Sequence, residues 1–350
     1  MSNAGVARYL TALSALLLPV VAFAHHSLLG YDQSQVVEFE GEVTGVFWRN
    51  PHVRLTVRAV DANGAEKIWT VEGASVNAME RGGINEAIVK VGDSIRLVGH
   101  PSNSVDDAVQ PVLLTMANGT AFVLNERSAA EFGLVDAASE AATGNAPAAI
   151  AANDLQVDSI FRVWTNTGHW GRDVRGWWAR DFPLTEAARL ELAAWDPETD
   201  NYAKRCIPAG MPEAMMQPFP IEFIDRGDTI ILKIEEWDNS RTIHLNADPE
   251  ADVPYSRMGY SVGRWEGDTL IVETNRINYP YFNDQGIPQS DAVKIIERFT
   301  LNAQDARLDW TAILTDPGTF TEPVTMAGMH WEWIPDNEIK PYNCVVDEKL

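Results

Sequence analysis

Short segments in which apolar and polar residues alternate follow one another between residues 36 and 124, and turn residues separate them. Residues 37–43 alternate with period two, which is typical of a β-strand that has one face against a core. Asn63-Gly64 predicts a hairpin turn, and residues 77–81 predict a short helix that Gly82-Gly83 ends. Three strands, a small helix and two strands predict an OB-type five-stranded barrel, with another small β-barrel as the alternative. The expected strands are residues 37–43, 53–60, 67–71, 94–98 and 112–124.

Alanine and small polar residues dominate residues 126–156, which predicts a linker. Residues 157–350 contain ten of the twelve tryptophans, one expected helix at residues 185–195, and many short strands. Their turn residues recur every 8–12 residues or so, a spacing typical of an antiparallel meander. The chain is therefore expected to be mainly β. Residues 25–125 are expected to form an OB-like barrel, and residues 157–350 a lipocalin-like barrel or, alternatively, a sandwich.

The first 24 residues have the pattern of an export signal. Arg8 supplies positive charge, residues 9–21 are apolar, and Ala22-Phe23-Ala24 fits a small-residue cleavage site. The apolar segment is shorter than the roughly 20 residues that span a bilayer, and no stop-transfer segment follows it. The sequence thus predicts an exported protein, periplasmic or secreted, with no membrane span after cleavage.

The charge balance narrows the range of partners. Lysine and arginine total 27 against 50 acidic residues, a net charge of −23. This negative field repels phosphate backbones and anionic lipids, so nucleic acid and membrane surfaces are not expected as partners. The sequence also lacks a glycine-rich phosphate loop, a GxSxG elbow and an HExxH motif, which argues against the common nucleotide-binding, serine-hydrolase and zinc-protease classes.

The sequence contains two cysteines, Cys206 and Cys344, both in the second half of the chain. In an oxidising compartment such a pair most simply forms one disulfide, which closes a loop of more than a hundred residues.

Cleavage after Ala24 would make His25 the mature amino terminus, followed by His26. An α-amine and an imidazole on the same residue can chelate Cu(II), and His52 and His100 lie in the same expected domain. Copper is therefore the one cofactor that the sequence suggests. The alternative is a solvated chain terminus without a metal.

Strand alternation places three charged side chains on inward faces of the second half. A two-residue turn at Asp238-Asn239 would put Glu236 opposite Arg241, and alternation puts Glu297 on an otherwise apolar face. Two carboxylates and one guanidinium are costly to keep ionised and dry, so one carboxyl is expected to have a raised pKa. Glu236 and Glu297 are thus candidate catalytic residues, and Arg241 is a candidate ligand-binding residue. The alternative is a structural Glu236–Arg241 pair with a hydrated Glu297.

Five tryptophans are candidates for lining an apolar pocket beside these charges. The alternative is that they fill the core, which is the commoner role of this side chain. They are Trp237, Trp265, Trp310, Trp331 and Trp333.

A resemblance to a known family rests on AHHS at residues 24–27, RNPHV at 49–53 and WTVEG at 69–73. These segments resemble a family of uncharacterised exported proteobacterial proteins. The second half is similar to a companion region of such proteins, through GRWEGDTL at residues 263–270. The resemblance implies export in a Gram-negative bacterium, to the periplasm or outside the cell, and a two-part architecture, and it implies no activity. Relatives often carry histidines where this chain has Gln289 and Lys294, so no catalytic or metal role is carried over to those two positions.

These observations suggest three functions. The first is an exported binding or accessory protein that holds a small, largely apolar ligand in the second barrel through Glu236, Arg241 and Glu297. The second is a lyase- or isomerase-type enzyme in which one inward carboxylate moves a proton. The third is a copper-binding protein that uses His25 and His26.

Overall fold

The computed structural model describes residues 30–60, 64–103, 105–134, 157–165, 181–196 and 199–346. The expected signal peptide, with His25 and His26, lies outside these residues, and so do residues 135–156 of the expected linker. No helix in the described ranges is long and apolar enough to cross a membrane.

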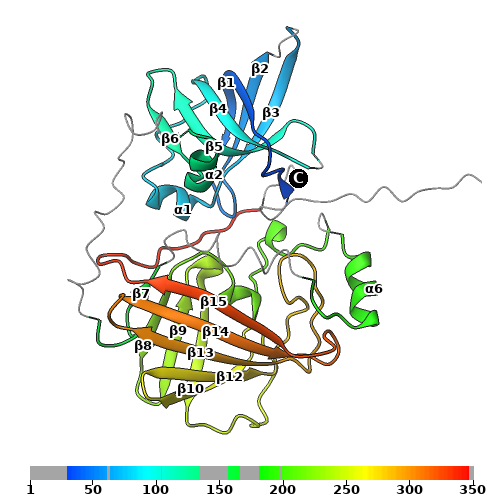
Figure 1. Cartoon of the computed structure of the whole chain (residues 1–350), viewed down its shortest axis with the longest axis vertical. Helices are drawn as coiled ribbons and strands as arrows, with labels where there is room; N and C mark the ends of the chain where they lie inside the picture. Colours follow the sequence, from blue (N-terminus) through cyan, green and yellow to red (C-terminus); the bar gives the residue numbers. More distant parts are fainter. Residues whose placement is uncertain are drawn as a thin grey trace, which may run out of the picture.

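The amino-terminal half forms a closed five-stranded barrel (Figure 1). The strands are hydrogen-bonded in the order β3-β2-β1-β4-β5, and a parallel pairing of β3 with β5 closes the cylinder. The helix α1 lies between β3 and β4 in the sequence, so both the strand order and the helix position agree with the OB-type prediction. The elements are β1 (Val37–Phe47), β2 (Arg54–Val60), β3 (Glu66–Glu72), α1 (Val76–Arg81), β4 (Ser94–Pro101), β5 (Ala108–Met116), β6 (Ala121–Val123) and α2 (Glu126–Glu131).

Alternating side chains of these strands fill the amino-terminal barrel. Val43, Val57 and Leu97 are completely buried, and Glu42, Arg58 and Arg96 beside them are exposed. The helix α1 begins after Ser75, whose hydroxyl accepts a hydrogen bond from the backbone N–H of Ala78 at 3.2 Å.

The carboxy-terminal half forms a nearly closed barrel in which nine strands follow the order β7 to β15 (Figure 1). Thr165, just after β7, exchanges two backbone hydrogen bonds of 2.9 Å with Glu332 at the end of β15, and this bridge joins the two edges. The predicted closure into a barrel is therefore confirmed. The strands are β7 (Val163–Trp164), β8 (Ile221–Asp225), β9 (Thr229–Ile234), β10 (Asn239–Leu245), β11 (Tyr260–Glu266), β12 (Thr269–Asn275), β13 (Lys294–Asn302), β14 (Arg307–Thr315) and β15 (Val324–Glu332).

One pairing departs from the predicted antiparallel meander. β10 pairs with β11 in parallel, over Ile243–Leu245 and Ser261–Gly263. Parallel neighbours start at the same end of a sheet, so residues 246–259 must run back along β10 before β11 begins. The predicted helix is confirmed as α6 (Glu186–Ala194), with Thr185 as its N-cap.

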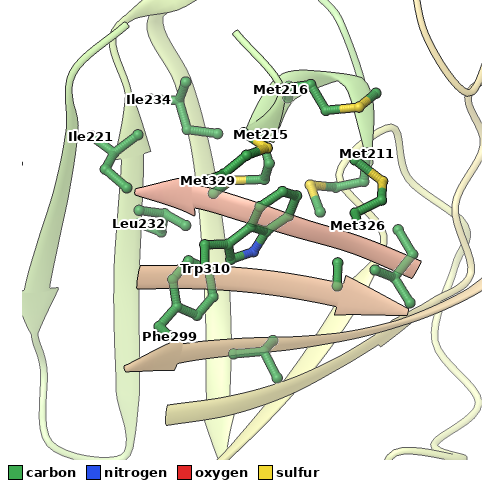
Figure 2. Packing of buried hydrophobic residues seen from close by; sticks show 14 of the residues in the cluster. Met211, Met215, Met216, Ile221, Leu232, Ile234, Phe299, Trp310, Met326 and Met329 are labelled. Carbon is green, nitrogen blue, oxygen red and sulfur yellow. The ribbon is translucent and has the colours of Figure 1, made fainter. Parts of the chain in front are cut away.

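Packed side chains fill the interior of the carboxy-terminal barrel. Trp164, Trp310 and Trp331 are at most 1 % exposed. Methionines from residues 211–216 and from β15 surround Trp310 (Figure 2). Methionine is unbranched and flexible, so it fills the irregular space beside large rings.

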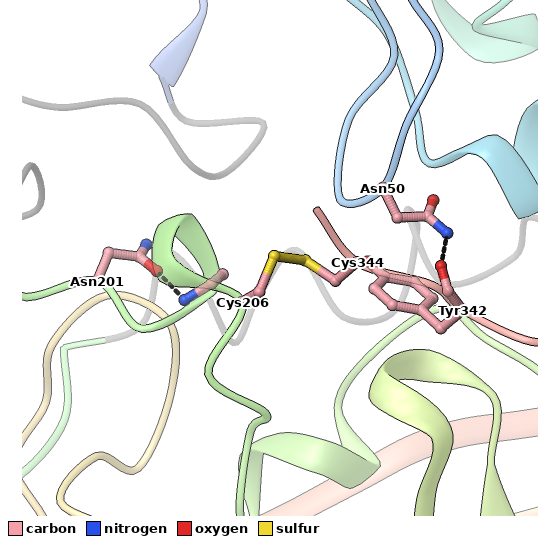
Figure 3. The surroundings of a disulfide bond; sticks show 6 residues. Asn50, Asn201, Cys206, Tyr342 and Cys344 are labelled. Atoms are coloured by element: carbon pink, nitrogen blue, oxygen red, sulfur yellow. Dashed lines mark hydrogen bonds between the residues drawn. A yellow bond between two sulfur atoms is a disulfide. The ribbon is translucent and has the colours of Figure 1, made fainter. Parts of the chain in front are cut away.

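The carboxy-terminal segment, residues 333–346, runs along the junction between the two barrels (Figure 1). Cys344 forms the predicted disulfide with Cys206, at a sequence separation of 138 residues (Figure 3). Next to it, the Asn50 amide donates to the backbone carbonyl of Tyr342, and the Asn50 carbonyl accepts from the backbone N–H of Val345 at 3.1 Å. The disulfide therefore holds in place a segment to which the amino-terminal barrel is hydrogen-bonded.

Candidate functional site

The turn between β9 and β10 differs from the predicted two-residue turn. Residues 235–238 connect the strands through the 3₁₀ turn η5 (Glu236–Asp238), so Arg241 pairs with Leu232 and not with Glu236. Trp237 and Asp238 adopt left-handed backbone conformations there, with φ of 61° and 50°. Because the shift in register is an even number of residues, Arg241 still points inward as alternation predicts.

Arg241 and Glu297 form a fully buried ion pair inside the carboxy-terminal barrel. Nη1 of Arg241 lies 3.1 Å from Oε1 of Glu297, and Nη2 donates to Oε2. The other guanidinium donors reach Ser261 Oγ at 2.9 Å, Thr274 Oγ1 at 2.7 Å and the sulfur of Met211 at 3.7 Å. These contacts use all five donors of the guanidinium.

Trp310 completes this network, since its indole N–H donates to Glu297 Oε1 at 3.1 Å. The inward placement of Arg241 and Glu297 agrees with the prediction, but the predicted pairing of Glu236 with Arg241 is wrong. Because all these hydrogen bonds are made to side chains inside the barrel, the Arg241–Glu297 pair has the features of a structural ion pair that stabilises the barrel.

Glu236 instead belongs to an acidic cluster with Glu213 and Asp284. Glu213 lies in the 3₁₀ turn η4 (Glu213–Met215), and Asp284 lies in the loop between β12 and β13. Glu213 and Glu236 are 6 % and 8 % exposed, whereas Asp284 is half-buried. The hydroxyl of Tyr279 donates to Glu213 Oε2 at 2.6 Å.

Burial changes the acid–base behaviour of all three carboxyls. It raises the pKa of Glu213 to about 8, with a further contribution from the nearby charge of Asp284. Burial raises the pKa of Asp284 to about 7. The pKa of Glu236 is raised well above its usual value by burial first and then by the charges of Glu213 and Asp284. The expected carboxyl with a raised pKa is therefore present, and it is Glu236.

Several buried polar atoms in this region have no hydrogen-bond partner among the described residues. Two are carboxylate oxygens, Oε2 of Glu236 and Oδ1 of Asp284, and three are amide atoms of the loop between β12 and β13. Folded proteins satisfy nearly all such atoms, so this region can accept polar groups from a bound molecule or from water. The three amide atoms are Nδ2 of Asn283, Nε2 of Gln285 and Oε1 of Gln289.

Aromatic rings adjoin the acidic cluster. Tyr279, which holds Glu213, packs its ring edge-on against Tyr202 and Tyr281, with centroids 5.8 Å and 6.3 Å away. Tyr202 and Tyr281 are half-buried and 5.4 Å apart. Gly210 lies behind Tyr279, and a Cβ at this position would come within 2.5 Å of Cγ of Tyr279. Polar acceptors and flat apolar surface thus occur side by side.

The five tryptophans that were predicted to line a pocket do not line one common pocket. Trp310 and Trp331 lie in the core with ring centroids 6.3 Å apart, whereas Trp265 is 41 % exposed on β11. Trp237 packs on Tyr342, and Trp333 stacks with Arg162. The structure therefore favours the core-filling alternative for Trp310 and Trp331.

The described histidines do not form a metal centre. His100 is completely buried, and its ring nitrogens contact the carbonyl of Gln35 at 2.7 Å and Ser128 Oγ at 2.8 Å. His52 contacts the carbonyl of Gly73. Within the described ranges, no group of three or more His, Cys, Asp or Glu side chains is placed to hold a metal ion. Copper binding by His25 and His26 stays a prediction.

Sequence reasoning found Glu236 but missed Glu213, Asp284 and Tyr279 as its neighbours. All three lie in turns and loops, where neither strand nor helix periodicity applies. One local signal of buried acids is present in the sequence, because the consecutive acids Glu235 and Glu236 directly follow an apolar strand.

Comparison with known proteins finds that part of the chain matches the model of a family of unknown function. A model described as "Family of unknown function (DUF6152)" matches residues 14–109, from the apolar amino-terminal segment to the beginning of β5. This match is consistent with the resemblance to an uncharacterised family that the RNPHV and WTVEG segments carry. No curated protein matches the chain.

Proposed function

We propose that this protein is an exported binding protein of the bacterial envelope. In this proposal it holds a small, largely apolar molecule by a cationic amine end, and the binding site is the acidic cluster of Glu213, Glu236 and Asp284. The observation that carries the proposal is the buried Glu236 carboxyl, whose Oε2 has no partner among the described residues. The disulfide and the signal-like first 24 residues support export.

An ammonium group is the chemical complement of this cluster. Burial favours the protonated carboxyls, and an adjacent cation favours the ionised forms, so the arrival of an amine compensates the buried charge. Binding should therefore release protons near neutral pH. The overall charge of −23 also favours the approach of a cation.

The tyrosine rings explain the apolar part of the proposed ligand. Tyr202, Tyr279 and Tyr281 offer flat surfaces beside the carboxyls, and aromatic faces attract cations as well as apolar groups.

The test uses the full mature chain and phenethylammonium as the probe, with the neutral isostere 2-phenylethanol for comparison. Titration calorimetry is expected to show saturable binding of the ammonium only, with an enthalpy that depends on the buffer because protons are released. Glu236→Gln is expected to weaken binding about tenfold or more, as loss of a hydrogen bond to a charged group does. The matched control is Glu322→Gln, which removes the same charge from an exposed position. Equal binding of amine and alcohol, or equal binding by the Glu236→Gln variant, contradicts the proposal.

A second candidate function is proton transfer by a lyase- or isomerase-type enzyme. The observation in its favour is that the pKa values of Glu213 and Asp284, about 8 and about 7, lie near neutrality, where a general acid or base works best. Substitution separates the two functions. In an enzyme, Glu213→Gln should abolish turnover and leave affinity largely intact, whereas in a binding protein it should weaken affinity.

A further inference from the structure

A polar groove lies where β10 and β11 separate. The two strands pair only from Ile243 and Ser261 onward, so no described strand pairs with the edge of residues 239–242 on the side away from β9. The open space there has a volume of about 310 Å³. Its polar lining consists of Ser240, Arg241, Thr242, His244, Ser256, Arg257 and Tyr260. The Arg241 guanidinium is paired with Glu297 inside the barrel.

The open edge of β10 presents backbone donors to this groove. The N–H of Asn246 donates to Gly263 on the β11 side, and the N–H of Leu245 donates to Asp228 on the β9 side. Successive N–H groups of a strand point to opposite sides, so those of Ser240 and Thr242 point toward the groove.

Arg257 is the arginine of the groove that has no acidic partner among the described residues. Its Nη1 donates to two neutral acceptors, the carbonyl of Ala209 at 3.3 Å and Oδ1 of Asn239 at 3.1 Å. No ion pair among the described residues involves Arg257, and burial lowers the pKa of its guanidinium. A partly desolvated cation without a counter-charge is stabilised by any anion that reaches it.

The backbone around Arg257 is held in place before any ligand arrives. Ser256 and Gly259 exchange hydrogen bonds across the turn, since the N–H of Gly259 donates to the Ser256 carbonyl and Ser256 Oγ donates to the Gly259 carbonyl, both at 3.1 Å. Gly259 has φ of 71°, and a Cβ there would come within 2.6 Å of the carbonyl oxygen of Asn275. The aliphatic part of the Arg257 side chain packs against Gly210.

We propose that this groove is a binding site for a small oxyanion, a phosphate or a carboxylate group. The guanidinium of Arg257 supplies the charge, and the hydroxyls and backbone N–H groups of the open β10 edge supply hydrogen bonds. The lining contains no Asp or Glu, in a chain with 50 acidic residues. This proposal does not rest on the amine-binding function proposed for the acidic cluster.

The negative net charge does not prevent this binding. Exposed charges are largely screened beyond about 8 Å at physiological ionic strength, so a local cation and its donors determine the affinity of a small anion. The net charge lowers the association rate more than it lowers the stability of the complex.

Titration calorimetry or NMR of the full mature chain tests the site, with phosphate and succinate as probes at constant ionic strength in chloride. Saturable binding of one or both is expected, and the preferred probe assigns the ligand to phosphates or to carboxylates. Arg257→Ala and Ser240→Asp are each expected to weaken binding about tenfold or more. Ser240 is exposed, so Ser240→Asp keeps the test valid if Arg257→Ala destabilises the fold.

The control is Arg264→Ala on β11, which removes the same charge from an exposed residue paired with Glu266. Affinity should be unchanged in this variant. Failure of both anions to bind saturably overturns the proposal. So does equal weakening by Arg257→Ala and Arg264→Ala, because that result indicates general charge screening.

Discussion

Arg81 and Glu235 form a bidentate ion pair across the junction between the two barrels, although 154 residues separate them in the sequence. Glu235 is completely buried, and it also accepts hydrogen bonds from the Asn77 amide at 3.0 Å and the Lys340 backbone N–H at 2.9 Å. One carboxylate thus receives donors from α1 and from the carboxy-terminal segment. It links α1 of the amino-terminal barrel to the carboxy-terminal half.

Removing the Arg81 side chain should destabilise the protein strongly. Arg81→Ala leaves the buried Glu235 charge with fewer donors, and breaking a buried pair in this way costs about 3–5 kcal/mol. Urea unfolding measures the change. The matched control is Arg58→Ala, whose pair with Glu42 is 42 % and 48 % exposed and should contribute less than about 1 kcal/mol. Similar losses in both variants would show that the junction pair has no special role.

The disulfide should be a large contributor to stability. Closure of a 138-residue loop is worth about 5 kcal/mol in the chain-entropy model. The Cys206→Ser/Cys344→Ser double variant should therefore unfold at a lower temperature, and its carboxy-terminal segment should exchange amide hydrogens faster. A variant with unchanged Tm and exchange rates would rule out this role.

Stability should fall as the pH rises from about 4 to 8. The folded-state pKa of Glu213 is raised from 4.5 to about 8, so the folded state keeps a proton that the unfolded state loses. This contribution is fully present below the unfolded pKa and is lost as the pH rises through the folded pKa, with a slope of up to about 1.4 kcal/mol per pH unit. Denaturant unfolding across this range measures the slope. Glu213→Gln should flatten it, and an unchanged slope in that variant would contradict the assignment.

The Arg241–Glu297 pair should matter for stability and not for binding of the amine probe. Glu297→Gln leaves a buried guanidinium without its counter-charge and should cost about 3–5 kcal/mol. The Arg241→Met/Glu297→Met double variant should recover much of that loss, because an apolar pair of similar size avoids the desolvation penalty. Urea unfolding and phenethylammonium titration of the same variants separate the two effects. A folded Glu297→Gln variant that loses probe affinity would restore Glu297 to the binding site.

Alternation along the strands was sufficient to predict that Glu297 and Arg241 point inward. Glu297 was placed on the inner face of its strand because its neighbours two positions away are apolar, and the structure confirms this placement. Arg241 was also correctly placed inward. The strand order of the amino-terminal barrel followed from the order of strands and helix, and the disulfide from the count of cysteines.

The contacts that sequence reasoning missed depend on turn conformation and on long-range packing. The register of β9 and β10 depends on the left-handed conformations of Trp237 and Asp238, and tryptophan rarely adopts that conformation, so the sequence does not indicate this turn. The parallel pairing of β10 and β11 depends on the path of residues 246–259, which has no periodic pattern. Arg81 and Glu235 meet only because the two barrels pack together.

Glu235 and Glu236 are consecutive residues with opposite attachments, since Glu235 is bound to the amino-terminal barrel and Glu236 belongs to the acidic cluster. A single peptide unit therefore connects the contact with α1 to the residue of the acidic cluster. A rotation of the first barrel against the second must either break the Arg81–Glu235 contact or displace the turn that carries Glu236.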